Sequence, residues 1–115
     1  MEIKIVKEEI LLQEVKKLAE DQYGDMVKAV VDVEKGIMAI GGELHADANE
    51  LLIEKENSNQ KNVWGINIYP DEANDKRIVF NSLINIKPLS GNKALNIGSE
   101  EVKNKIKEIV NRLIK

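Results

Sequence analysis

The chain contains no cysteine, and this absence alone removes several functions. Disulfide bonds, thiolate nucleophiles and cysteine-based zinc sites are excluded. No apolar run approaches the roughly 18 residues that a membrane span needs, and the N-terminus carries no apolar signal segment. We therefore predict a cytoplasmic protein without a membrane partner.

Aromatic residues are also scarce, at 3% of the chain, and positive charge is not in excess. Seventeen basic residues stand against twenty acidic ones, which leaves a net charge of −3. Binding to a phosphate backbone normally needs a positive field, and stacking on bases needs aromatic side chains. We therefore predict no nucleic-acid partner.

At 115 residues, of which 43% are hydrophobic, the chain is long enough for one packed core. We therefore treat residues 1–115 as a single domain. Residues 8–22 carry one apolar stripe at helical spacing that stops before Gly24, and a second helix begins after Ser99, a favourable N-cap. Because each helix has one stripe, both should pack on the same face of a sheet.

Elsewhere the apolar period is two, which is typical of strands. The predicted strands are 3–6, 26–33, 37–40, 51–55, 63–69 and 77–87, with a tight hairpin at Gly36. The predicted fold class is α+β: a mainly antiparallel sheet of five or six strands with an N-terminal and a C-terminal helix packed on one face. The predicted core is Leu11, Val15, Leu18, Val31, Trp64, Ile66, Phe80, Ile84, Ile106, Ile109 and Leu113.

The one histidine, His45, lies in a run from Gly41 to Asn49 in which polar and apolar residues alternate. In an extended chain, Glu43, His45 and Asp47 would point the same way, because side chains alternate faces along a strand. One imidazole and two carboxylates suit a divalent metal or proton transfer. The alternation therefore makes these three residues the candidate catalytic cluster.

Geometry argues against a metal site built on this strand alone. Three consecutive side chains on one face of a strand span about 13 Å from the first to the third, which is wide for one ion. A lone imidazole away from a motif is more often a hydrogen-bonded structural residue. We therefore predict that His45 is structural and that the protein holds no metal and no cofactor.

Two helices on one face would leave the second face of the sheet open. A mixture of charges, amides and aliphatic side chains on that face suits an interface or a ligand floor. The predicted ligand or interface residues are Asp32, Asn67, Tyr69, Leu83, Asn85 and Lys87, with Lys28 and Val30 beside them. The alternative is a plainly solvated face.

The loop after Pro88 is a further candidate. Ser90, Gly91, Asn92 and Lys93 could present amides and a lysine to an anion. The loop matches no phosphate-binding glycine motif, and a Gly-Asn pair is common in turns, so an ordinary loop is the simpler interpretation.

Four segments carry a resemblance to a known family. They are Lys28 to Glu34, Gly41 to Asp47, Trp64 to Pro70, and Ile84 to Pro88 followed by Gly91 and Asn92. In this order they resemble a small uncharacterised prokaryotic family, a domain of unknown function that occupies essentially the whole chain. The resemblance implies a free-standing small protein and assigns no activity, cofactor or partner.

Two functional hypotheses follow. The leading one is a small cytosolic binding or interaction domain that uses the open sheet face and the 41–49 bend, either for a small molecule or as a homodimer. The alternative is a small hydrolytic or metal-dependent enzyme centred on Glu43, His45 and Asp47. A concave pocket that gathers the imidazole and both carboxylates would favour the enzyme, and a spread along a solvated rim would favour the binding domain.

Overall fold

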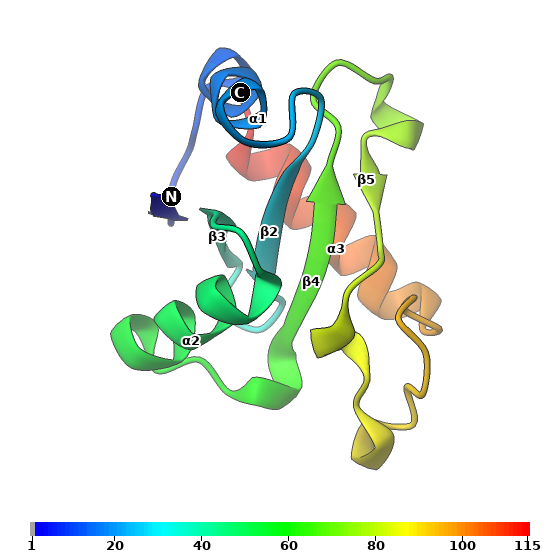
Figure 1. Ribbon diagram of the computed structural model, residues 1–115. Coiled ribbons are helices and arrows are strands. Elements are labelled where there is room, and N and C mark those ends of the chain that lie inside the picture. Colours follow the sequence, from blue (N-terminus) through cyan, green and yellow to red (C-terminus); the bar gives the residue numbers. More distant parts are fainter. Residues whose placement is uncertain (1) are drawn as a thin grey trace.

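The computed structural model describes residues 2–115 and contains a five-stranded sheet and three α-helices (Figure 1). The strands are β1 (Ile3–Val6), β2 (Val27–Asp32), β3 (Ile37–Gly41), β4 (Val63–Ile68) and β5 (Ile78–Val79), in the spatial order β1-β3-β2-β4-β5. All neighbouring strands pair antiparallel. The helices are α1 (Leu12–Gln22), α2 (His45–Glu56) and α3 (Glu100–Leu113). The predicted α+β class with an antiparallel sheet is confirmed.

The β2–β3 hairpin occupies the middle of the sheet, and Asp32 holds its turn. The buried carboxylate of Asp32 accepts hydrogen bonds from the backbone N–H groups of Glu34 (2.9 Å) and Lys35 (3.0 Å). The hydroxyl group of Ser58 donates a third bond to it (2.6 Å). Gly36 adopts a φ of +69°, a left-handed conformation that favours glycine, so the hairpin predicted at this residue is confirmed.

Helices α1 and α3 pack on one face of the sheet, as their apolar stripes predict. Their buried side chains form one cluster with the strands: Val15, Ala19, Ile106, Val110 and Leu113 meet Val31, Met38, Ile40, Trp64, Ile66 and Ile68. Ser99 caps α3 by accepting the N–H of Val102 (3.2 Å), and Arg112 in the last turn donates to the carbonyl of Gly36 (2.7 Å). Among residues 2–115, no helix has the length and apolar character needed to cross a membrane.

Helix α2 lies on the opposite face of the sheet, where the sequence predicts no helix (Figure 1). The extended run predicted over 41–49 and the strand predicted over 51–55 are both wrong, because His45–Glu56 is helical throughout. A hairpin between 51–55 and 63–69 is therefore absent. The strand predicted over 63–69 is confirmed as β4.

Two features explain the helix. Gly41 and Gly42 have φ values of +109° and +85°, so the chain turns away from the sheet directly after β3. Ala48 and Leu52, four positions apart, then form a short buried stripe that packs on Val30 and its neighbours. A stripe of two residues is too short to stand out from an alternating pattern.

The segment after β4 also differs from the prediction of one strand over 77–87. Only β5 pairs with β4, and two short 3-10 helices follow at Leu83–Asn85 and Pro88–Ser90. Beyond β5, the side chain of Asn85 makes the hydrogen bonds to β4 that a neighbouring strand would otherwise make. Its Oδ1 accepts the N–H of Gly65 (2.7 Å), and its Nδ2 donates to the carbonyl of Gly65 (2.9 Å). One amide side chain therefore closes the edge of β4.

Seven of the eleven predicted core residues are buried, and four differ. Leu11 is 58% exposed because it precedes α1 as the N-cap residue. Ile84 packs against the α2 side of the sheet rather than with α3. Leu18 and Phe80 are only partly buried against the cluster of α1 and α3.

We expect Asn85→Ala to lower the free energy of unfolding by about 2–4 kcal/mol, because it leaves the buried N–H and carbonyl of Gly65 without partners. Leu83→Ala is the matched control. Leu83 belongs to the same 3-10 helix but is 77% exposed, so its loss should cost less than about 0.5 kcal/mol. Urea unfolding of both variants measures the difference, and equal midpoints would show that another contact holds this edge of the sheet.

Candidate functional site

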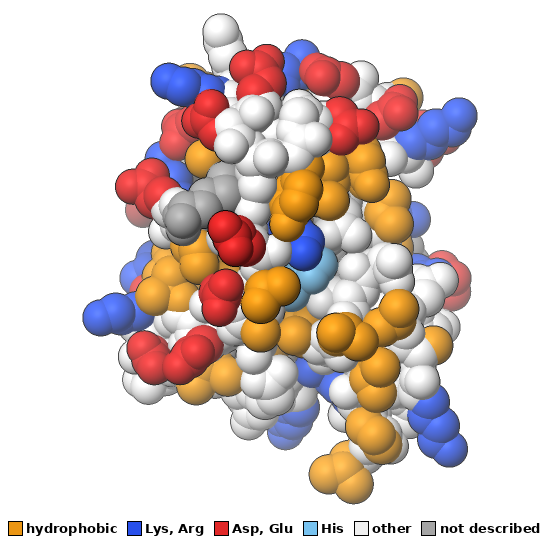
Figure 2. Space-filling model, viewed as in Figure 1, with side chains coloured by type: hydrophobic (Ala, Val, Ile, Leu, Met, Phe, Trp, Pro, Cys, Tyr) orange, Lys and Arg blue, Asp and Glu red, His pale blue; other side chains and the backbone are white. Residues whose placement is uncertain are grey.

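The part of the sheet face that α2 leaves uncovered contains a hollow of about 370 Å³. Figure 2 shows it on the same side as α2, with the histidine in pale blue, a basic side chain in blue beside it and apolar side chains around it. The residues that line it are Met26, Lys28, Leu44, His45, Ala46, Asn67, Asn81, Ser82, Leu83 and Ile84. We call this the α2 hollow.

The floor of the α2 hollow depends on Gly65 of β4. A Cβ atom at this position would lie 2.5 Å from the Ser82 hydroxyl oxygen and 3.1 Å from Cδ2 of His45. The imidazole and the hydroxyl therefore occupy the space that any larger residue would fill. The hydroxyl oxygen of Ser82 accepts the N–H of Ile84 (3.3 Å), which holds the 82–84 turn against β4.

His45 is the first residue of α2, and its ring turns inward to the sheet. Nε2 lies 2.7 Å from the carbonyl oxygen of Ile66, and because a carbonyl can only accept, this nitrogen carries the proton. Burial lowers the pKa of His45 below its ordinary value of 6.5. The bond to Ile66 opposes this shift, the charge of Lys28 adds to it, and the amide of Asn67 opposes it. The neutral ring joins the start of α2 to β4.

Lys28 of β2 supplies the positive charge of the α2 hollow. Its Nζ donates to the carbonyl of Glu43 (2.8 Å) and lies 5.4 Å from the centre of the Tyr23 ring. The Tyr23 hydroxyl donates to the same carbonyl (3.0 Å). The N-cap residue of α2 is Leu44, whose side chain cannot accept a hydrogen bond, so no side chain caps this helix. Lys28 and the start of α2 contribute positive charge at this end of the hollow, and the exposed carboxylates of Glu43 and Asp47 at the same helix end oppose it.

The structure separates the three residues of the predicted catalytic cluster. Glu43 precedes α2 and its side chain is exposed, Asp47 is exposed on the first turn of α2, and His45 points to β4. In the part of the chain that the structure describes, no three His, Asp or Glu side chains are placed to hold one metal ion. The strand on which the cluster depended does not form.

Helix α2 also divides the predicted ligand face. Val30 is fully buried beneath the helix, and Asp32 is used by the hairpin turn. Asn67 and Leu83 line the α2 hollow, where Nδ2 of Asn67 donates to the carbonyl of Asn81 (3.2 Å). Tyr69 is half-buried beyond the end of β4 and does not line the hollow. Asn85 is fully buried at the edge of β4.

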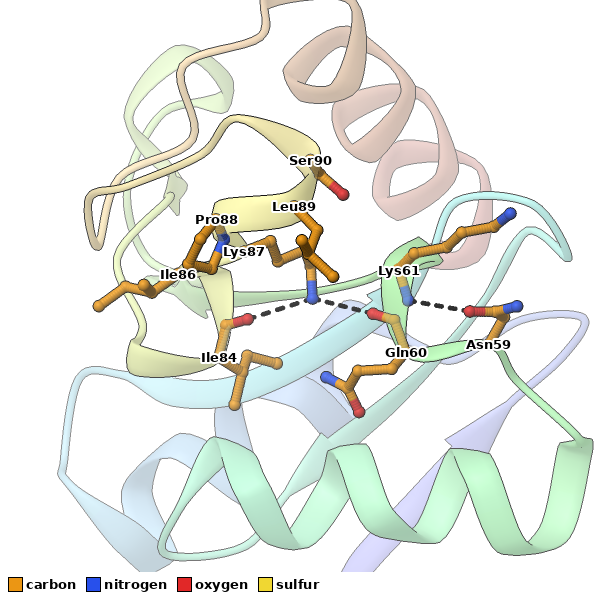
Figure 3. Close-up of a pocket in the computed structure, with 9 residues that line it drawn as sticks. All are labelled: Asn59, Gln60, Lys61, Ile84, Ile86, Lys87, Pro88, Leu89 and Ser90. Carbon is orange, nitrogen blue, oxygen red and sulfur yellow. Dashed lines mark hydrogen bonds between the residues drawn. The ribbon is translucent and has the colours of Figure 1, made fainter.

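Lys87 lies apart from this hollow, in a second cleft of about 360 Å³ (Figure 3). We call it the Lys87 cleft. Nζ of Lys87 donates to the carbonyls of Gln60 (2.9 Å) and Ile84 (3.2 Å) and lies 5.1 Å from the centre of the Trp64 ring. Burial lowers the pKa of Lys87. Sequence reasoning missed this cleft, because its only signal is a lysine between isoleucine and proline.

The side chain of Asn92 in the predicted anion loop is bound to the backbone around it. Nδ2 of Asn92 lies within hydrogen-bond distance of the carbonyls of Asn85, Ala94 and Asn96, and Oδ1 accepts the N–H of Gly98 (2.9 Å). Gly91, at φ +83°, ends the 3-10 helix Pro88–Ser90. Lys93 is exposed, and Ser90 instead lines the Lys87 cleft.

These features define a small α+β protein in which, over residues 2–115, the α2 hollow and the Lys87 cleft lie apart and the predicted catalytic cluster is not assembled. The model of a family described as "Protein of unknown function (DUF5674)" matches residues 4–113. The chain therefore belongs to this family, and the resemblance to an uncharacterised family over essentially the whole chain is confirmed. No curated protein and no solved structure matches the chain.

We expect the protein to lose stability between about pH 7.5 and about pH 5.5 because of His45. Its folded-state pKa lies below 6.5, so the unfolded chain binds the proton more readily. The contribution of the neutral ring is complete at about pH 7.5, one unit above the unfolded-state pKa, and falls as the pH falls through about 6.5 toward the folded-state pKa. His45→Gln keeps an N–H donor and should flatten this slope. Urea midpoints of both proteins at the two pH values test this, and parallel slopes would assign the effect to other groups.

Proposed function

We propose that this protein is a small binding module that holds a small polar molecule in the α2 hollow. The main support for this proposal is the hollow itself, a concave site on the part of the sheet face that α2 leaves uncovered. Its volume of about 370 Å³ is at the lower end of the range for small-molecule sites. The same surface is where the sequence places the leading candidate for binding.

The side chains that line the α2 hollow indicate which chemical groups a ligand would need. Lys28 and the uncapped start of α2 favour an electronegative group at one end. Asn67 and Ser82 can exchange hydrogen bonds with a polar group at the floor. Leu44 and Leu83 stand at the rim and would contact an apolar part.

Binding is better supported than hydrolysis. Ser82 and His45 both lie against Gly65, but within residues 2–115 no hydrogen bond joins the hydroxyl to the ring. Activation of a serine by histidine needs a direct hydrogen bond between the two. We also propose the cytoplasm as the place of action, because a cysteine-free fold needs no oxidising compartment.

Ala46→Phe tests the site without touching the core, because Ala46 is exposed on the first turn of α2 and lines the hollow. A panel of small amides, alcohols and phosphates titrated into ¹⁵N-labelled protein should shift the amide signals of Lys28, His45 and Ser82. The phenyl ring should fill the hollow and remove these shifts, whereas Glu54→Phe on the outer side of α2 should keep them. Shifts that persist in Ala46→Phe, or a panel without any binder, would overturn the proposal.

A second copy of the chain is the other candidate for this surface. Exposed apolar side chains favour it, since Leu44, Val79 and Leu83 share the α2 side of the sheet. In that case we expect light scattering to give a dimer for the native sequence and a 13.0 kDa monomer for Leu83→Glu, which places a charge in the contact. A monomer for both proteins would remove this candidate.

A further inference from the structure

The Lys87 cleft contains a buried positive charge that no acidic side chain neutralises within residues 2–115. Lys87 is 9% exposed, and it forms none of the ion pairs that these residues make. Its two hydrogen bonds go to the backbone carbonyls of Gln60 and Ile84. An ammonium group has three N–H donors, so one donor remains for a further partner.

The surroundings of Nζ stabilise the charge only in part. The two carbonyl dipoles and the face of Trp64 favour the ammonium form. Removal from water opposes it, and this effect lowers the pKa of Lys87. An anion in the cleft would satisfy the third donor and the charge at once, because charge-assisted hydrogen bonds are the stronger kind.

The walls of the cleft indicate the chemistry of the part of the ligand that does not contact Lys87. None of the nine lining residues is acidic, although the chain as a whole carries a net charge of −3. Ile84, Ile86, Pro88 and Leu89 make much of the wall apolar. Figure 3 shows Nζ of Lys87 in the middle of the lining residues, with Leu89 on one side and Ile84 on the other. The ammonium of Lys61 points away from them.

We propose that the Lys87 cleft binds the carboxylate group of a small aliphatic acid. The carboxylate accepts the third N–H of Lys87, and the aliphatic chain lies along Ile84 and Leu89. The volume of about 360 Å³ limits the ligand to a short chain. A free acid and the C-terminal residue of a peptide share this chemistry, since both join a carboxylate to an aliphatic group.

This site is separate from the proposed function. The Lys87 cleft and the α2 hollow share one lining residue, Ile84, and no polar side chain. A ligand in one does not need the polar groups of the other. Failure of either proposal therefore leaves the other open to its own test.

The test uses hexanoate as the probe and hexanamide as its neutral counterpart, each titrated into ¹⁵N-labelled protein. We expect hexanoate to shift the amide signals of Gln60, Ile84 and Leu89 and to bind about tenfold more tightly than hexanamide. Lys87→Met should weaken hexanoate binding by about tenfold or more, because it removes the charge and keeps a similar volume. Lys93→Met is the matched control, because Lys93 is exposed and does not line the cleft, and its affinity should stay within about twofold of the native value.

A second variant guards against a folding defect in Lys87→Met. Leu89 is fully exposed, so Leu89→Asp leaves the core untouched and adds a carboxylate at the rim. It should weaken hexanoate binding by about fivefold at low salt, and added salt should reduce this loss. Leu89→Asn is the neutral control for the lost aliphatic contact.

A free acid and a peptide C-terminus are distinguished as ligands with the dipeptide acetyl-Ala-Leu, whose C-terminus is either free or amidated. Tighter binding of the free-terminus peptide than of hexanoate would identify a peptide terminus, and the reverse would identify a free acid. Equal affinity for hexanoate and hexanamide, or no loss in Lys87→Met, would overturn the proposal. Hexanoate shifts confined to Lys28 and His45 would also overturn it, while supporting the α2 hollow as a binding site.

Discussion

The hydrogen bonds between the side chain of Asn85 and the backbone of Gly65 hold the segment after β5 against the sheet. Both polar groups of Gly65 would otherwise be buried without partners at the edge of β4. The amide of Asn85 satisfies them and also donates to the carbonyl of Leu95 (3.0 Å), so it ties the 82–98 region to the sheet. Because the 82–90 segment is placed in this way, it can form one wall of each hollow.

The absence of a side chain at Gly65 shapes the α2 side of the sheet. It lets the ring of His45 reach the carbonyl of Ile66 and lets Ser82 lie against β4. Helix α2 is thereby fixed at its first residue, with Ala48 and Leu52 packed further along. The helix covers Val30 and leaves the Lys28 end of the face open, which is why a hollow exists there at all.

Each of the two hollows contains one titratable side chain whose pKa is shifted, the half-buried His45 in one and the buried Lys87 in the other, and the charges around the two differ. Burial lowers the pKa of both His45 and Lys87. The neutral ring of His45 donates to a single carbonyl, and its positive neighbour Lys28 disfavours protonation further. Lys87 has two carbonyls, an aromatic face and no acidic neighbour in its cleft, so its surroundings suit an anion. This member of a family without an assigned activity thus has two hollows whose linings differ in chemistry.

The features that depend on local spacing could be predicted from the sequence. The stripes of α1 and α3, the cap at Ser99 and the turn at Gly36 are readable because each depends on neighbouring residues. Helix α2 could not be predicted from the sequence, because only two of its residues are buried and they give a weak helical pattern. Packing of these residues on Val30 stabilises the helix. The positions of Asn85 and Lys87 are decided by contacts across 20 or more residues, with Gly65 and Gln60. Such contacts leave no periodic trace in the chain, so only the tertiary structure could place the edge of β4, the α2 hollow and the Lys87 cleft.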